Sequence, residues 1–385
     1  MRTILISERG SALLIALCLM GMLTLAALLA VNTSNTDVDL AFNQLNADKA
    51  FYIAEAGAKR GIAEIRTDRT WNFGFSNLSF GGGMFSVTIA DSTTDPGLID
   101  TIIVTSSGEA NGASATVEIT LIPEYIYPFR YAMFADDIVD IRNSMATDSY
   151  ASDSGTYLST VLNEYGDVGS NGIVDINNGA VINGDAVTSL VGGLSVNTGA
   201  IVTGNVTDTA PPQILDIVPQ SEYDSALANN SASTGLSGSY TYDPVTHDFE
   251  TDGDVIFQSG VYYFSTFTLL NSASVTLAPG AQVTIYVTGD IEIKNSGDIN
   301  PTGDPGDLIF YSQEDLVLKN SGTIHGVFYA PEGNADLRNS ADFFGSIVAG
   351  EIVAHNSAGF HYDRRLSRIK KGDTGDVLLI AWKEL

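Results

Sequence analysis

One uninterrupted apolar segment near the N-terminus limits what this chain can fold into more than any other feature. Residues 11–31, SALLIALCLMGMLTLAALLAV, contain no charged side chain. As a helix, 21 residues are about 31 Å long, which matches the hydrocarbon thickness of a bilayer. Residues 1–10 precede the segment as a short leader that carries the charges of Arg2, Glu8 and Arg9. The segment therefore predicts one membrane-spanning helix.

The helix is expected to continue beyond the apolar segment as an amphipathic helix. Contact-forming side chains recur at intervals of three and four residues between Leu45 and Ala63, and no proline lies between residues 11 and 66. We therefore predict one long helix over residues 11–66, of which 11–31 is the transmembrane part.

Two short motifs in this region resemble those of type IV pilin-like proteins. Glu8-Arg9-Gly10-Ser11-Ala12-Leu13 resembles the junction that prepilin peptidases cut, and residues 50–57, AFYIAEAG, are similar to a stretch of PilX-type minor pilins and pilus-assembly proteins. The resemblance covers residues 1 to about 66. It implies cleavage after Gly10, so that Ser11 is the first mature residue. It also implies three kinds of partner: a prepilin peptidase, other pilins, and inner-membrane pilus assembly proteins.

The N-terminus departs from the major pilins at two positions. Ser11 stands where those proteins have Phe, and Ile15 occupies mature position five, where they have Glu. Two other interpretations remain open: a secretory signal peptide and a plain membrane anchor. A signal peptide is disfavoured because its apolar core is shorter, 7–15 residues, and because Leu28-Leu29-Ala30 is a poor cleavage site.

Charge and cysteine content restrict the class of protein. Acidic residues outnumber basic ones 46 to 18, which gives a net charge of −28 and argues against nucleic acid as a partner. The single cysteine, Cys18, lies in the apolar segment, so the chain has no intramolecular disulfide. The 38 glycines and the low charged fraction of 17% are typical of a β-rich, turn-rich protein.

A small antiparallel β region is predicted over residues 67–125. Residues 84–89, 100–105 and 115–121 are strand-like in composition, and turn sequences separate them. Pro123 and Pro128 mark the end of this region.

Beyond residue 130 a short motif recurs, and from residue 271 onward its copies are 17–25 residues apart. Its core is apolar–basic–Asn–Ser, and its asparagines are Asn143, Asn271 (whose copy lacks the basic residue), Asn295, Asn320, Asn339 and Asn356. A second similarity aligns residues 321–330 with 340–349 at an offset of 19. Periods of 17–25 residues with alternating aliphatic side chains predict a β-solenoid over residues 130–365, with the asparagines at its corners.

If the coils stack in register, acidic and basic residues form two columns on one face. Asp290, Asp315 and Glu351 open the strands that Lys294, Lys319 and His355 close. Solvated strand ends without a partner are an equally good interpretation.

Two segments break the repeat. Residues 208–254 are rich in Pro, Ser and Asn and are expected to leave the solenoid, with a short helix at 221–228. Residues 366–385 are expected to form a C-terminal basic tail and a final strand, which caps or pairs with an earlier sheet.

The sequence contains no motif of a known catalytic or phosphate-binding site. The four histidines are scattered, and a structural role is favoured over a metal site. Two acidic groups have the oxygen ligands that calcium requires, although solvated loops are favoured: Asp136, Asp137 and Asp140 in one, and Asp298, Asn300, Asp304 and Asp307 in the other. The first group is also a candidate for the paired carboxylates of a polysaccharide-cleaving solenoid. We therefore expect neither an enzyme nor a cofactor.

The expected fold class is α+β and mostly β: a long N-terminal helix, a small antiparallel region, then a β-solenoid. The expected function is a minor pilin-like structural subunit of a type IV pilus or type II secretion pseudopilus, at the tip or in the priming complex. The protein is expected to cross the inner membrane once before assembly and to lie in a pilus, at the cell surface or in the periplasm afterwards. The alternative is a membrane-stalked surface solenoid that binds or cleaves polysaccharide.

Overall fold

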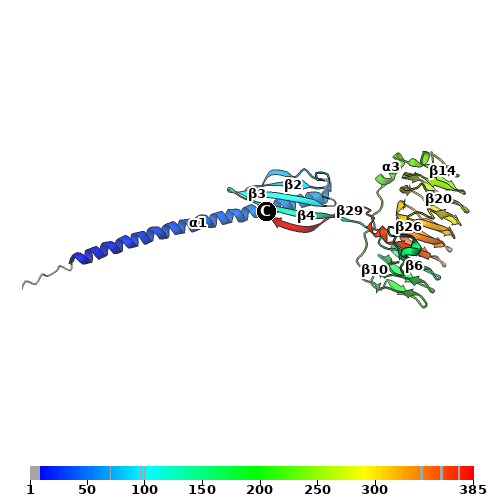
Figure 1. Ribbon diagram of the computed structural model, residues 1–385, viewed down its shortest axis with the longest axis horizontal. Coiled ribbons are helices and arrows are strands. Elements are labelled where there is room, and N and C mark those ends of the chain that lie inside the picture. Colours follow the sequence, from blue (N-terminus) through cyan, green and yellow to red (C-terminus); the bar gives the residue numbers. More distant parts are fainter. Residues whose placement is uncertain are drawn as a thin grey trace, which may run out of the picture. The chain divides into compact units, whose positions relative to one another are not determined.

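The computed structural model describes residues 9–69, 71–95, 98, 101–338, 341–355, 359–371 and 373–385. The chain divides into two compact units (Figure 1). Unit 1 comprises the residues up to Tyr125 together with Asp373–Leu385, and unit 2 comprises Ile126–Gly372. Along the sequence, unit 2 is therefore an insertion into unit 1.

Unit 1 consists of one long helix and one antiparallel sheet. Its elements are α1 (Arg9–Thr67), β1 (Phe75–Phe80), β2 (Gly83–Ala90), β3 (Ile102–Ala110), β4 (Ala113–Tyr125) and β29 (Asp373–Glu384). The strands lie in the order β1-β2-β3-β4-β29, and each neighbouring pair is antiparallel. The long N-terminal helix and the antiparallel strands after it agree with the sequence prediction.

The C-terminal half of α1 packs on this sheet through small side chains. Ala50, Ala54 and Ala58 are completely buried. Gly57 lies so close to the strands that a Cβ atom there would clash with the side chains of Ser106 and Phe85. The alanines and the glycine of the pilin-like motif thus form the face on which the helix approaches the sheet.

The last strand pairs with an earlier sheet, as predicted, but that sheet is the one of unit 1, so residues 366–385 do not form one tail. Arg364–Arg368 form a short 3-10 helix, η3, in unit 2, whereas β29 pairs with β4 in unit 1. Val377 of β29 is buried in the same apolar cluster as Leu121 of β4. The chain therefore returns to complete the sheet after passing through unit 2.

Unit 2 is built almost entirely of short strands. The first group of elements is β5 (Met133–Ile141), β6 (Ala146–Tyr150), α2 (Tyr157–Thr160), β7 (Val168–Ser170), β8 (Ile173–Ile176), β9 (Val181–Ile182), β10 (Ala186–Thr188), β11 (Leu194–Val196), β12 (Ile201–Val202) and β13 (Val206–Thr207). The second group is α3 (Gln220–Ala228), η1 (Ser231–Ser233), β14 (Leu236–Gly238), β15 (Thr241–Tyr242), β16 (Asp248–Thr251), β17 (Val255–Phe257), β18 (Gly260–Phe264), β19 (Thr266–Leu269), β20 (Ser274–Leu277), β21 (Val283–Val287) and β22 (Ile291–Asn295). The third group is β23 (Asp298–Ile299), η2 (Pro305–Asp307), β24 (Leu308–Ser312), β25 (Leu316–Asn320), β26 (Thr323–Arg338), β27 (Asp342–Ala354), β28 (Gly359–Asp363) and η3.

Most strands of unit 2 pair in parallel with a strand one coil away. Phe267 of β19 lies beside Ile291 of β22, which lies beside Leu316 of β25. These side chains point inward and are buried, because successive side chains of a strand point to opposite faces. Inside the stack, the rings of Phe310 and Phe328 lie 4.6 Å apart at an interplanar angle of 2°. The core is thus one continuous apolar column through the coils.

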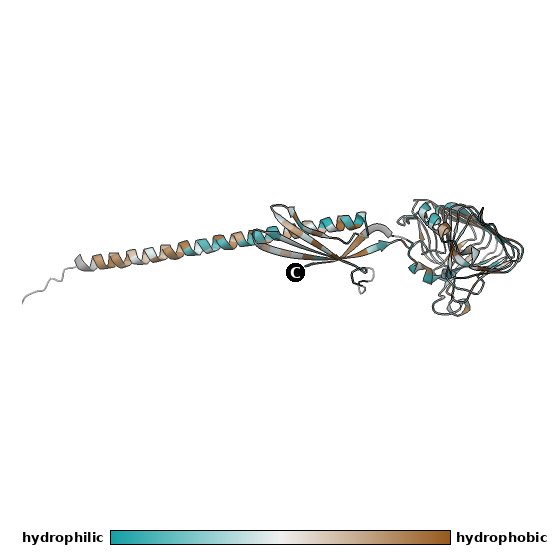
Figure 2. Ribbon diagram, turned by 90° about the horizontal axis from the view of Figure 1, so that it is seen from above, coloured by the Kyte–Doolittle hydropathy of each residue, from teal (hydrophilic) through white to brown (hydrophobic). Residues whose placement is uncertain are grey.

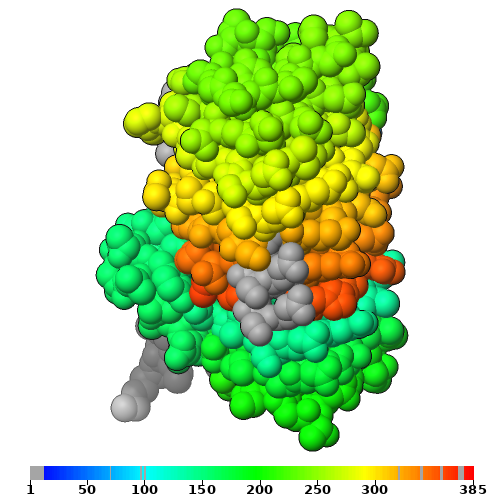
Figure 3. Space-filling view, turned by 90° about the vertical axis from the view of Figure 1, so that its right-hand side faces the viewer, coloured from blue at the N-terminus to red at the C-terminus, as the bar shows by residue number. Residues whose placement is uncertain are grey.

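The coils do not stack in the order of the sequence. The strands β5 and β6 pair with β27 and β28 on one side and with β7, β8 and β9 on the other. The chain therefore enters the stack in its middle, reaches one end at β13, resumes at the opposite end with β14, and returns to the middle through β28. Figure 3 shows this order, with orange and red coils directly followed by the turquoise residues near 140. The repeats alone do not reveal the order, because every copy of the motif has the same pattern.

The segment outside the stack is shorter than the predicted 208–254. A helix lies where one was expected, as α3. However, β16 already pairs in parallel with β19, and its Phe249 is completely buried. The excursion from the stacked coils therefore ends before Asp248.

The chain leaves unit 2 beside the point where it enters. The backbone N–H of Lys371 donates a hydrogen bond to the carbonyl oxygen of Ile126, at 3.0 Å. The Lys371 ammonium lies 4.2 Å from the ring centroid of Tyr311 and 3.8 Å from a carboxylate oxygen of Glu222. Burial lowers the pKa of Lys371, although Glu222 opposes that shift. The contacts of Lys371 thus hold the segment that leaves unit 2 against unit 2 itself.

Candidate functional site

The N-terminal half of α1 is an apolar surface with no cover among the described residues. Figure 2 shows this half in brown, followed by a mixed half that carries polar side chains. Leu13 is 72% exposed and Val31 is 58% exposed. By length and composition the helix can cross a membrane, a test that an N-terminal signal sequence also passes. An exposed apolar helix of this kind requires lipid or other helices around it.

Two threonine hydroxyls in and next to this half of the helix are satisfied by the helix itself. The Thr24 hydroxyl donates to the carbonyl oxygen of Gly21 at 2.9 Å, and the Thr33 hydroxyl donates to that of Leu29 at 2.8 Å. Such internal hydrogen bonds reduce the cost of placing a hydroxyl in an apolar environment.

The predicted processing site lies at the start of this helix. Gly10 and Ser11 have helical backbones in the first turns of α1, and residues 1–8 lie outside the described part of the chain. Ile15, the predicted mature position five, is 59% exposed on the apolar half. An isoleucine offers no carboxylate to an N-terminal amine of a neighbouring subunit.

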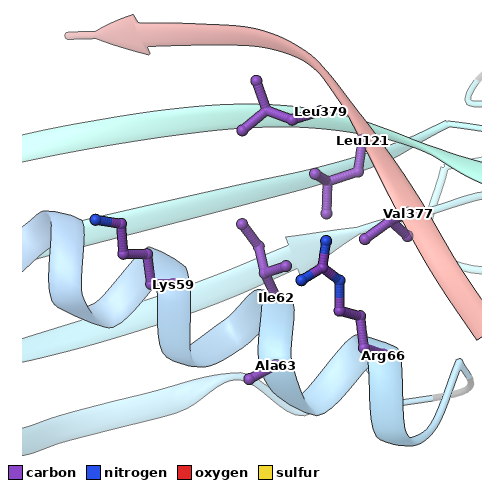
Figure 4. Close-up of a pocket in the computed structure, with 7 residues that line it drawn as sticks. All are labelled: Lys59, Ile62, Ala63, Arg66, Leu121, Val377 and Leu379. Carbon is purple, nitrogen blue, oxygen red and sulfur yellow. The ribbon is translucent and has the colours of Figure 1, made fainter.

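Two grooves of unit 1 flank the packed half of α1. The first has a volume of about 380 Å³ and lies between α1 and β29 (Figure 4). Its lining is Lys59, Ile62, Ala63 and Arg66 of the helix, Leu121 of β4, and Val377 and Leu379 of β29. The second has a volume of about 490 Å³ and is lined by α1 residues from Leu45 to Ile53 and by the turns at Phe80 and Asn111. Both linings are suited to apolar contact.

Four of the six predicted corner asparagines lie at or just beyond the ends of strands in unit 2. Asn143, Asn271 and Asn295 have left-handed backbones, with φ of 58°, 55° and 64°. Asn295 lies beside Asn320 in the paired strands β22 and β25. Asn339 and Asn356 lie outside the described residues.

Aspartates at other corners bind the next coil, a role the sequence analysis missed. One carboxylate oxygen of Asp167 accepts the backbone N–H of Asp185 at 2.7 Å, and Asp185 in turn accepts that of Asn205 at 2.6 Å. Asp298 accepts from Thr323, and Asp315 from Asn334, in the same way. Each of these carboxylates satisfies a backbone donor on the neighbouring coil. In the sequence, each of these aspartates stands 18–25 residues before the residue whose backbone N–H it accepts. That offset is the signal from which this role could have been predicted.

The basic residues at the strand ends form a column. Lys294, Lys319 and Arg338 stand in register on β22, β25 and β26. Lys294 and Arg338 each bind the acid two residues earlier on their own strand, Glu292 and Asp336, both at 2.6 Å. The pairs are partly exposed, so each stabilises the fold only slightly.

The candidate calcium residues have protein partners. Asp304 and Asp307 bind the Arg365 guanidinium at 2.9 and 3.2 Å. Asp298 accepts a backbone N–H, and Asn300 donates to the carbonyl oxygen of Asp304 at 3.2 Å.

In the other group, Asp136 accepts from the Asn171 amide at 2.7 Å and Asp140 binds Arg142. Asp137 is exposed and contributes its backbone carbonyl, which accepts from the Ser170 hydroxyl at 3.0 Å. Within the described residues no three His, Cys, Asp or Glu side chains are arranged to hold a metal ion.

Two of the four scattered histidines meet in an aromatic column. His325, Phe344 and His361 lie in register on three successive coils, and the ring centroids are 4.2 and 4.4 Å apart. His361 continues the column to Asp148, whose carboxylate lies 2.8 Å from its Nδ1 atom. Tyr157 covers the column, 4.5 Å from the His361 ring. The aligned repeats 321–330 and 340–349 already place His325 beside Phe344.

His247 and His355 lie elsewhere. The Nδ1 atom of His247 is 2.9 Å from the Tyr242 hydroxyl oxygen, and the backbone N–H of His355 donates to the carbonyl oxygen of Leu337 at 2.8 Å.

A polar groove of about 350 Å³ lies at one corner of unit 2. Its lining includes Glu164, Tyr165, Asp167 and Asp185. Burial and the neighbouring Asp185 charge raise the pKa of Asp167. Asp167 and Asp185 are the carboxylates that bind the next coil, so Glu164 is the carboxylate in the groove without that structural role.

Comparison with known proteins gives one family match. A family described as a domain of unknown function (DUF7305) matches residues 197–369, which is less than half of the chain. No curated protein matches the chain significantly.

Two solved structures are similar to the chain at low scores. The competence-associated pilin ComZ from Thermus thermophilus has a TM-score of 0.27 and 12% identity, covering 88% of this chain and 97% of its own. The DUF3494 domain of ice-binding protein 1 from Shewanella frigidimarina has a TM-score of 0.35 and 14% identity, covering 63% of this chain and 97% of its own. Both TM-scores are too low to establish a shared fold.

Proposed function

We propose that this chain is a minor pilin-like subunit, a non-enzymatic structural component of a type IV pilus or a type II secretion pseudopilus. The observation that carries the proposal is the division of α1 into two halves. The apolar half is uncovered, whereas the amphipathic half is fixed to a small sheet by Ala50, Ala54, Gly57 and Ala58. A helix of this kind is stable in lipid first and then among the helices of a filament core.

Unit 2 is, in this proposal, a β-solenoid that the subunit displays outside the membrane. The support is the parallel register of its strands from coil to coil, such as Ile291 with Leu316. Its size argues for few copies at a tip or in a priming complex, because a unit of about 250 residues is difficult to repeat around a thin filament. Ile15 points the same way, since it lacks the carboxylate that the pilin resemblance implies for the bulk subunit.

Processing by a prepilin peptidase is the first test. We expect the peptidase to cut between Gly10 and Ser11 when the two proteins are co-expressed, as read by N-terminal sequencing. Gly10→Val should block the cut, because a β-branched side chain prevents close approach to the backbone. Gly21→Val is the matched control: a Cβ atom at Gly21 meets nothing within 4 Å, so this variant should be processed normally. A mature N-terminus at Val31 or Asn32 contradicts the proposal and restores the signal peptide.

The position in the filament is tested separately. Deletion of the gene should reduce pilus number or adhesion while the major subunit remains in the cells. Gold labelling of unit 2 should mark filament ends. Even labelling along whole filaments contradicts the tip position without affecting the pilin assignment.

A second candidate function, binding or cleavage of a polysaccharide by unit 2, is favoured by the groove that contains Glu164. Cleavage requires a carboxylate free to exchange a proton, and Glu164 is the one in that groove not bound to the next coil. We expect Glu164→Gln to abolish any release of reducing ends from acidic or neutral polysaccharides. Unchanged release in that variant rules out this site.

A further inference from the structure

The two ends of the coil stack in unit 2 are built differently. At one end two short strands reverse direction: β14 pairs antiparallel with β17, and β15 pairs antiparallel with β16. Tyr240, between them, stacks on the buried Phe249 with centroids 6.1 Å apart at an angle of 23°. This end therefore covers its own core, as terminal repeats of stacked proteins do.

The opposite end has no such cover among the described strands. There β11, β12 and β13 pair with β8, β9 and β10 on one side only. Val196 and Val206 stand in register with the buried residues Ile176 and Ala186, yet they are 39% and 55% exposed. These side chains occupy core positions, and no further coil among the described residues buries them.

The distribution of charge separates the two ends further. The uncovered terminal coil, residues 189–210, contains Asp208 as its single charged residue, in a chain with a net charge of −28. Residues 236–254, which close the other end, contain five acids and no Lys or Arg: Asp243, Asp248, Glu250, Asp252 and Asp254. Acidic side chains keep exposed strand edges from pairing, whereas an uncharged apolar edge associates readily. Only the covered end thus has this protection.

We propose that the uncovered coil, residues 189–210, binds the same coil of a second copy of this chain. A two-fold axis places the edge strands β11, β12 and β13 of one copy opposite the same three strands of the other copy. The rotation makes each pair of facing strands antiparallel. Antiparallel pairing is how β14 and β15 already cover the other end. Asp208 is bound within its own coil, because its carboxylate accepts the backbone N–H of Gly192 at 3.0 Å. The contact buries Val196 and Val206 in both copies and leaves the acidic ends far apart.

Hydrogen exchange of the unmodified full-length protein in detergent is the first test. Amide exchange in peptides that cover residues 189–210 should slow as the protein concentration rises through the dissociation range. Exchange in peptides that cover residues 236–254 should not change. Added salt should strengthen the dimer, because it screens the repulsion between two chains of charge −28. Protection that grows with concentration only in α1 assigns the association to the helix and overturns the proposal, as does a monomer at all concentrations.

Charged variants give the second test, with mass measured by sedimentation velocity. Val206→Lys places like charges against each other and should weaken the dimer by about 100-fold or more. Val245→Lys is the matched control, because Val245 is 83% exposed in the turn between β15 and β16 at the covered end. It should leave the dimer unchanged. Equal weakening by both variants, or none by Val206→Lys in a protein with normal circular dichroism, overturns the proposal.

Discussion

An engineered disulfide can test the most unexpected feature of unit 2, the return of the chain from β27 onto β5. Ile138 of β5 and Glu351 of β27 lie directly beside each other in paired parallel strands. Neighbouring strands are about 4.8 Å apart, which lies within the Cα separation that a disulfide accepts. In a Cys18→Ser background, Ile138→Cys with Glu351→Cys should therefore form a disulfide.

The size of the stabilisation follows from the length of the loop that is closed. The pair 138 and 351 encloses about 214 residues, for which the chain-entropy treatment gives about 5 kcal/mol as an upper bound. Glu351 also lies beside Asn334 of β26, within one coil of sequence. That pair encloses about 18 residues, and the same treatment gives about 3 kcal/mol. The long-range disulfide should therefore raise the free energy of unfolding by about 2 kcal/mol more than the short-range one.

The assay compares urea unfolding of each oxidised variant with the same protein after reduction. Asn334→Cys with Ile138→Cys is the control, because these positions are two coils apart, about 9.6 Å, and should remain free thiols. If this control pair crosslinks while the 138–351 pair does not, the stacking order is wrong. A long-range disulfide that stabilises no more than the short-range one refutes the loop-entropy reasoning instead.

Three further predictions concern single side chains, each read from the midpoint of urea unfolding. Asn295→Leu should cost about 1–2 kcal/mol, because its φ of 64° is unfavourable for a branched side chain, whereas Asn295→Gly should cost little. Phe343→Ala should lower the free energy of unfolding by about 3–5 kcal/mol and Phe343→Leu by about 1 kcal/mol, because Phe343 is buried. Phe73→Ala, at an 89% exposed ring, should change it by no more than about 0.5 kcal/mol. Equal effects at the two sites contradict the assigned core. Burial lowers the pKa of His325, so the folded state favours the neutral ring, and stability should fall as the pH drops below about 6.5 through that lowered pKa. His325→Phe should reduce this loss, and an unchanged pH profile contradicts it.

Local patterns were sufficient to predict the helix and part of the strand register. The predicted helix 11–66 is α1, because an apolar run and three- and four-residue spacing specify a helix without reference to distant residues. The offset of 19 between residues 321–330 and 340–349 is the offset by which β26 and β27 pair. Both signals lie within a short stretch of sequence, which is why they were readable.

The arrangement of distant segments could not be predicted from local sequence patterns. The partners of β5 lie both about 35 and about 210 residues away, and any coil with the same inward apolar side chains presents an equivalent edge. Likewise, Val377–Trp382 is a continuous apolar run typical of a strand, but nothing in it specifies β4 as its partner. In the aromatic column, the repeat alignment places His325 beside Phe344, but it does not reach His361, which joins the column only through the stacking of the next coil.

The position of β29 makes the folding of unit 1 depend on that of unit 2. During synthesis, β4 emerges about 250 residues before its edge partner β29. Closing a flexible loop of that length costs about 5 kcal/mol of chain entropy. A folded unit 2 removes most of that cost, because Ile126 and Lys371 are already hydrogen-bonded to each other. Until then the β4 edge is open and Leu121 lacks Val377 beside it. A chain that stalls or is cut within the coils therefore retains α1 but presents an incomplete sheet, with the β4 edge that β29 would cover left open to other strands.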